Sequence, residues 1–86
     1  MGGGEDKNME IHKIYDNGGK TIDRYTVVTE PSYTNDLWQC LGVDSIGGRG
    51  FSQWSECRLG RHLGKLIKFE DLPIETQKHV TERLAE

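Results

Sequence analysis

Short runs of apolar, β-branched and aromatic residues recur along the chain up to Phe69, separated by segments that contain glycine or proline. Runs of this length and composition predict β-strands, which we place at residues 10–15, 21–29, 37–43, 51–57 and 65–69. Asn17-Gly18 predicts a β-hairpin between the first two, because a type I′ turn needs positive φ at both central residues.

The hairpin prediction leaves two details open. Ile22 is out of phase with Tyr25 and Val27, which indicates a bulge or a register slip near the turn. The second glycine, Gly19, also allows a loop longer than two residues. Pro31 is expected to end the second strand, since proline cannot donate a hydrogen bond to a neighbouring strand.

After Phe69 the spacing of apolar residues changes from that of a strand to that of a helix. Pro73 suits the first turn of a helix, and Asp71 and Glu75 place negative charge near the positive end of its dipole. The expected apolar stripe consists of Ile74, Gln77, Val80 and Leu84. A helix of about 13 residues is marginal alone and should pack on the sheet. The sequence therefore predicts an α+β fold: a small, mostly antiparallel β-sheet opened by a β-hairpin, with one C-terminal α-helix packed on it.

A chain of 86 residues has room for one domain. Residues 1–9 include three consecutive glycines and predict a flexible tail, either native or an appended leader, so the domain is expected to span residues 10–86. No apolar run approaches the roughly 20 residues of a membrane span, and the N-terminus lacks the pattern of a secretory signal. These features predict a cytoplasmic protein without a membrane partner.

Charge is distributed unevenly, although the net charge is only −3. Residues 1–46 carry eight acidic and four basic residues, and residues 70–86 carry five acidic and two basic ones. Residues 47–69 instead carry one acidic and five basic residues, interleaved with aromatic ones. Cations bind phosphates and exposed aromatic rings stack on unpaired bases, so this segment predicts contact with nucleic acid or another phosphate-bearing or acidic partner. The candidate residues are Arg49, Phe51, Trp54, Arg58, Arg61, Lys65 and Lys68.

Two alternatives stay open for the same residues. One alternative places Trp54 and Phe69 in the core of so small a domain, with the cations merely solvating one face. The other makes the chain a regulator or inhibitor of a host protein, with Tyr33 and Trp38 as anchoring residues. An exposed edge strand would then pair with the partner or with a second copy, so both monomer and homodimer are compatible with the sequence.

Catalysis and metal binding have weaker support. Cys57 and His62 could form a thiolate–imidazole pair, but nothing in the sequence supplies a third group. Cys40, Cys57 and His62, with His12 or His79 as a distant fourth, lack the close pairing of ligands typical of structural zinc. Cys40 and Cys57 are expected to stay reduced in the cytoplasm as small, half-buried apolar residues. The sequence thus predicts a non-enzymatic binding module without a cofactor or metal.

Several segments together resemble small uncharacterised prokaryotic proteins carried on phages and plasmids. They are residues 14–21, 23–28, 50–54, 60–65 and 71–73, which read YDNGGKT after Ile14, then DRYTVV, GFSQW, GRHLGK and DLP. The resemblance covers roughly residues 10–84. It implies an accessory protein of a mobile element that binds host proteins or nucleic acid, and it assigns no catalytic or binding residue.

Overall fold

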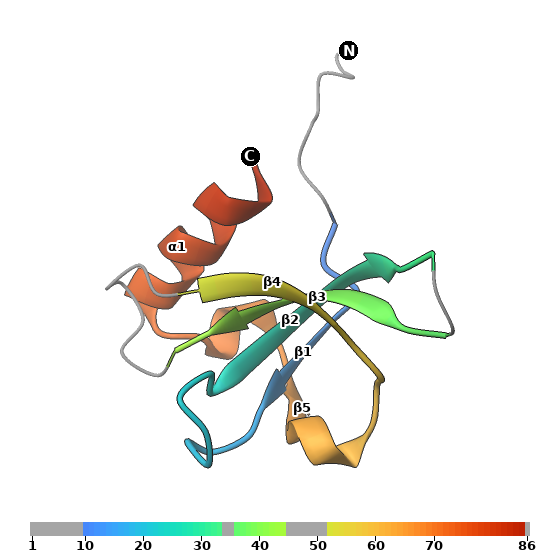
Figure 1. Ribbon diagram of the computed structural model, residues 1–86. Coiled ribbons are helices and arrows are strands. Elements are labelled where there is room, and N and C mark those ends of the chain that lie inside the picture. Colours follow the sequence, from blue (N-terminus) through green and yellow to red (C-terminus); the bar gives the residue numbers. More distant parts are fainter. Residues whose placement is uncertain (1–9, 34–35, 45–51, 86) are drawn as a thin grey trace.

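The structure is a computed structural model that describes residues 10–33, 36–44 and 52–85. Five antiparallel strands form one sheet in the order β4-β3-β2-β1-β5, and helix α1 lies on one face of it (Figure 1). The strands are β1 (Lys13–Asp16), β2 (Tyr25–Pro31), β3 (Trp38–Val43), β4 (Ser52–Cys57) and β5 (Lys65–Ile67). Two 3₁₀ turns, η1 (Arg61–Leu63) and η2 (Phe69–Asp71), precede α1 (Ile74–Leu84). The predicted α+β fold with one C-terminal helix is confirmed.

Apolar side chains of the central strands are buried on both faces of the sheet. On the face of α1, the core contains Ile14, Val27 and Leu41, joined by helix residues Val80 and Leu84. On the opposite face, a second cluster is formed by Tyr15, Val28 and Cys40. Side chains alternate between faces along a strand, so consecutive apolar residues fill both clusters. Burial on both faces explains why the strands read as continuous apolar runs instead of alternating ones.

The predicted hairpin between β1 and β2 is present, but its loop is longer than a two-residue turn. Asp16 pairs with Tyr25, so residues 17–24 form the loop. The Asn17 side chain organises it, since Oδ1 accepts from the amides of Gly19 and Lys20 at 2.8 and 3.0 Å. Positive φ occurs at Gly18 and Gly19 and not at Asn17. Hydrogen bonds of the asparagine side chain therefore replace the type I′ geometry.

The irregularity expected beside the turn lies at the far end of β2. The register between β2 and β3 shifts between Val28 and Pro31, whereas pairing next to the loop is regular. Ile22 is out of phase because it belongs to the loop, where its side chain is 81% exposed. β2 does end at Pro31, as predicted.

Helix α1 buries Val80 and Leu84 as predicted, but Thr76 and not Ile74 completes the buried side. Ile74 is 62% exposed, whereas Thr76, Val80 and Leu84 are buried. These three residues are four positions apart and lie on one side of the helix. Residues 70–71 belong to η2, and Pro73 is the N-cap residue instead of lying inside the first turn. The helix therefore begins at Ile74, later than the position of Asp71 suggested.

Candidate ligand-binding face

The connection between β4 and β5 (residues 58–64) links the two opposite edges of the sheet (Figure 1). It crosses the face opposite α1, because it packs on the core cluster of that face. Its apolar residues Leu59 and Leu63 pack against the second core cluster. Arg58 and Arg61 are exposed on the same connection. The leucines therefore anchor the connection on this face, and Arg58 and Arg61 are its exposed cations.

Lys68 extends this positive charge beyond β5. Leu66 pairs with Tyr15, whose side chain lies on the face opposite α1. The backbone of Lys68 is extended, so its side chain lies on the same side as that of Leu66. By the same alternation, Lys13 in β1 shares the face of Tyr15. Among the described residues, Arg58, Arg61 and Lys68 form no ion pair.

Two other described cations, Arg24 and Lys65, lie beside the Asp16 carboxylate at the end of β1. Arg24 donates from Nε and Nη2 to the two carboxylate oxygens of Asp16, at 2.8 and 3.2 Å. This hydrogen-bonded pair, helped by the amide of Gly18 and the nearby charge of Lys65, holds the pKa of Asp16 below its ordinary value of 3.8, against the raising effect of desolvation. Lys65 therefore lies beside a carboxylate, in contrast to Arg58 and Arg61.

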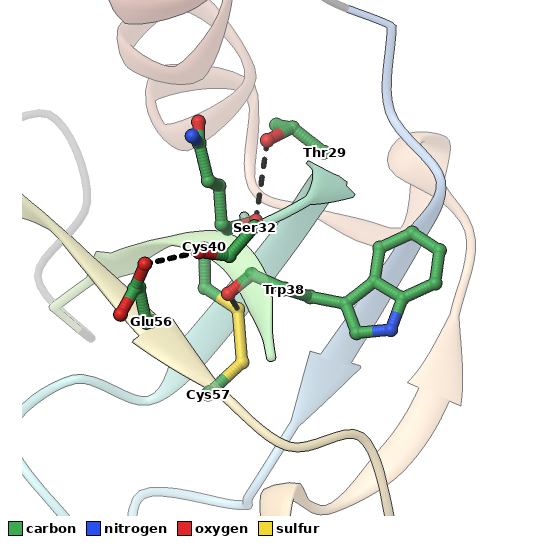
Figure 2. The surroundings of a disulfide bond; sticks show 7 residues. Thr29, Ser32, Trp38, Cys40, Glu56 and Cys57 are labelled. Atoms are coloured by element: carbon green, nitrogen blue, oxygen red, sulfur yellow. Dashed lines mark hydrogen bonds between the residues drawn. A yellow bond between two sulfur atoms is a disulfide. The ribbon is translucent and has the colours of Figure 1, made fainter. Parts of the chain in front are cut away.

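An aromatic pair lies on the face opposite α1. The rings of His12 and Trp38 are stacked, with centroids 4.4 Å apart and planes inclined by 12°. Trp38 contacts the second core cluster, and its indole points away from the neighbouring disulfide (Figure 2). His12 is exposed. The stack therefore presents a flat ring to solvent on the same face as the unpaired cations.

The predicted basic and aromatic segment does not form a single surface. Trp54 lies in β4 on the face of α1, half-buried, with the Arg83 guanidinium 6.0 Å from its ring centroid. Lys65 and Lys68 lie at the opposite edge of the sheet from Trp54. Arg49 and Phe51 lie outside the described residues. The structure thus brings Arg58, Arg61 and Lys68 to one face and separates Trp54 from them.

Of the two aromatic residues predicted to contact a protein, only one is integrated into the fold. Tyr33 follows β2 and is 99% exposed, whereas Trp38 packs on the second core cluster and on His12. Sequence reasoning considered His12 only as a distant metal ligand and did not select Lys13. The alternation of Lys13 with Ile14 and Tyr15 was the available signal for its orientation.

The two cysteines form a disulfide and not the reduced pair expected from the sequence (Figure 2). Cys57 ends β4 opposite Trp38, and Cys40 lies in β3 opposite Ser55, two pairing positions away along the ladder. This diagonal position brings their Cα atoms to 6.5 Å, within reach of a disulfide. Cys57 therefore has no thiolate to pair with His62. No three His, Cys, Asp or Glu side chains within the described ranges are placed to hold a metal ion.

A concave region of about 380 Å³ lies beside β4. Its described lining is Gln39, Trp54, Ser55 and Glu56. Glu56 also accepts a hydrogen bond from the hydroxyl of Ser32 (Figure 2). This region combines an aromatic ring, an amide, a hydroxyl and a carboxylate, a set of groups that differs chemically from the cationic face.

Comparison with protein-family models, with curated proteins and with solved structures finds no match to this chain. The resemblance to phage- and plasmid-borne proteins consequently stays a prediction. In the part of the chain that the structure describes, no helix is long and apolar enough to cross a membrane.

Proposed function

We propose that the protein is a non-enzymatic binding module whose face opposite α1 contacts single-stranded nucleic acid. The observation that carries the proposal is the presence of exposed Arg58, Arg61 and Lys68, without ion pairs among the described residues, on the same face as the His12–Trp38 stack. Cations that follow a phosphate backbone, combined with a ring on which a base stacks, are the two elements of binding to single strands.

The arrangement assigns separate roles to these residues. The guanidinium groups of Arg58 and Arg61 and the ammonium of Lys68 would contact phosphates, which sets affinity and its salt dependence. The exposed ring of His12, supported from behind by Trp38, would carry one base. Because the net charge of the chain is −3, binding must come from this face and not from a general attraction to polyanions.

Fluorescence anisotropy with a labelled polythymidine strand of about 12 nucleotides tests the proposal. With three phosphate contacts, affinity should fall roughly 20-fold between about 50 and 200 mM salt. The double variant Arg58→Gln/Arg61→Gln should bind more weakly with a shallower salt dependence. His12→Ala should weaken binding without changing that dependence, since it removes stacking and no phosphate contact.

Lys78→Gln is the matched control, because Lys78 is an exposed cation on α1, away from the proposed face. It should bind like the unmodified protein. The proposal fails if no binding is seen at low salt, or if the double variant and the control bind equally well. A cytoplasmic location, which we retain as part of the proposal, would keep thiols reduced, whereas the structure joins Cys40 and Cys57 in a disulfide. The titration is therefore performed both with and without reductant.

A further inference from the structure

The two edges of the sheet differ in their capacity to accept another strand. β5 has three residues, begins with Lys65 and is followed by Lys68, and short strands with lysines are poor templates for pairing. β4 has six residues, Ser52–Cys57, without lysine or proline. All six pair with β3, and among the described strands β4 pairs with no other. β4 therefore presents the longer row of available backbone groups.

Side-chain contacts to α1, to Ser32 and to β3 hold β4 in place. Ser52 is hydrogen-bonded to His79 of α1 at 2.7 Å, and Trp54 lies beneath Arg83 of the same helix. Glu56 binds the Ser32 hydroxyl, and Cys57 is linked covalently to β3. An edge strand that is already ordered loses little conformational entropy when a partner strand is added to it.

The side chains beside this edge favour a partner with positive charge. Glu56 is the single charged residue of β4 and is exposed. With Trp54 and Gln39 it lines the 380 Å³ concave region. A carboxylate next to an amide oxygen favours a cationic side chain through Coulombic attraction and charge-assisted hydrogen bonding, and the Trp54 ring offers apolar contact to the stem of that side chain.

We propose that β4 is a docking edge for an extended basic peptide segment. The peptide adds as a sixth strand antiparallel or parallel to β4, and one of its lysine or arginine side chains enters the region beside Glu56. Backbone hydrogen bonds to the edge would supply affinity, and the side-chain region would supply specificity. This proposal does not depend on the nucleic-acid proposal, since it uses the other face and an edge of the sheet.

NMR titration of the ¹⁵N-labelled protein tests the docking edge with a short peptide of alternating valine and lysine. The lysine peptide should shift and protect backbone amides of β4, and its valine–glutamate counterpart should not. Two versions of the lysine peptide, N-methylated at odd or at even positions, separate strand addition from general attraction. One version must lose binding and the other retain it, because only alternate residues of an added strand face the edge.

Charge selection is tested with Glu56→Lys, which should weaken binding of the lysine peptide by about tenfold or more and allow the glutamate peptide to bind. Glu70→Lys is the matched control, because Glu70 is an exposed acid in η2, away from β4. It should retain the preference for lysine. Amide spectra of both variants establish that they fold.

Four results would overturn the proposal. They are the absence of binding up to the solubility limit of the peptide, shifts centred on β5 or on the face opposite α1, equal binding of both N-methylated peptides, and self-association of the protein through β4 without peptide. The last result would identify a second copy as the occupant.

Discussion

Gly64 joins the β4–β5 connection to the hairpin at a point with no space for a side chain. Its φ is 112°, a backbone conformation that L-residues rarely adopt. A Cβ atom at this position would lie 2.2 Å from the carbonyl oxygen of Asp16 and 2.6 Å from the Cα of Asn17. Glycine is therefore required by both backbone conformation and close packing.

Gly64→Ala should consequently lower the free energy of unfolding by more than about 2 kcal/mol, because strain and a backbone clash act together. Gly19→Ala is the control: Gly19 has a φ of 89°, but a Cβ there meets nothing within 4 Å. Gly19→Ala should lower the free energy of unfolding by only about 1 kcal/mol, from backbone strain alone. Urea denaturation measures both changes. Equal costs for the two variants would contradict the packing argument.

Asp16 should make the stability of the protein depend on pH. Its hydrogen-bonded pair with Arg24 lowers the folded-state pKa below the ordinary 3.8. The ionised carboxylate therefore favours the folded state above about pH 4, and this contribution is lost as pH falls through the folded-state pKa. Asp16→Asn should be less stable than the unmodified protein at pH 7.

The difference between Asp16→Asn and the unmodified protein should narrow as pH falls from about 5 toward 2. Because Arg24 is partly exposed, solvent screening should keep the effect at pH 7 small. Urea denaturation across this pH range measures it, with Glu30→Gln, an exposed acid of β2, as the control that keeps the Asp16–Arg24 pair intact. A constant difference at all pH values would rule out the Asp16–Arg24 pair as its source.

At the scale of elements, residue composition located every described strand and the helix but placed their ends less accurately. The apolar runs are visible in the sequence because the central strands are buried on both faces. The ends depend on side-chain hydrogen bonds. Asn17 extends the hairpin loop, and the Nε2 of Gln77 donates to the carbonyl of Leu72 at 2.9 Å beside the start of α1. Such hydrogen bonds do not recur at a regular spacing, so the pattern of apolar residues in the sequence does not reveal them.

β4 is the element most dependent on a covalent link. The disulfide joins it to β3 across a sequence separation of 17 residues. Closing a loop of this length removes entropy from the unfolded chain and stabilises the fold by about 3 kcal/mol. The pair could not be assigned from the sequence, since two cysteines are compatible with either redox state.

Reduction, or the double substitution Cys40→Ala/Cys57→Ser, should therefore lower the free energy of unfolding by about 3 kcal/mol. Urea denaturation with and without a reductant measures the effect, and the double variant should not respond to reductant. A midpoint that is unchanged on reduction would show that the two cysteines are not linked in the protein as it exists in solution.

At the scale of the whole molecule, the fold class was predictable and the arrangement of strands was not. Local composition predicts strands followed by a helix, but strand order is determined by pairing between distant residues. β4 and β5 are separated by seven residues, 58–64, and lie at opposite edges. This topology divides the basic and aromatic segment between two surfaces, so that neighbours in sequence have different surroundings.

The resulting distribution of charge gives the molecule two chemically distinct surfaces. Arg58, Arg61 and Lys68 lie on the face opposite α1, and Glu56 lies at the β4 edge. An anionic ligand and a basic peptide would each be attracted by one surface and repelled by the other. The two proposed ligands should therefore not compete directly for one site.

The positions of the two tryptophans have a spectroscopic consequence. Trp38 is stacked on His12 beside the proposed nucleic-acid face, whereas Trp54 lines the region beside the β4 edge. Indole emission depends on the immediate surroundings of each ring. The emission of Trp38→Phe comes from the indole of Trp54, and that of Trp54→Phe from the indole of Trp38. Each single-tryptophan protein thus carries its own optical reporter for one of the two surfaces, without an added dye.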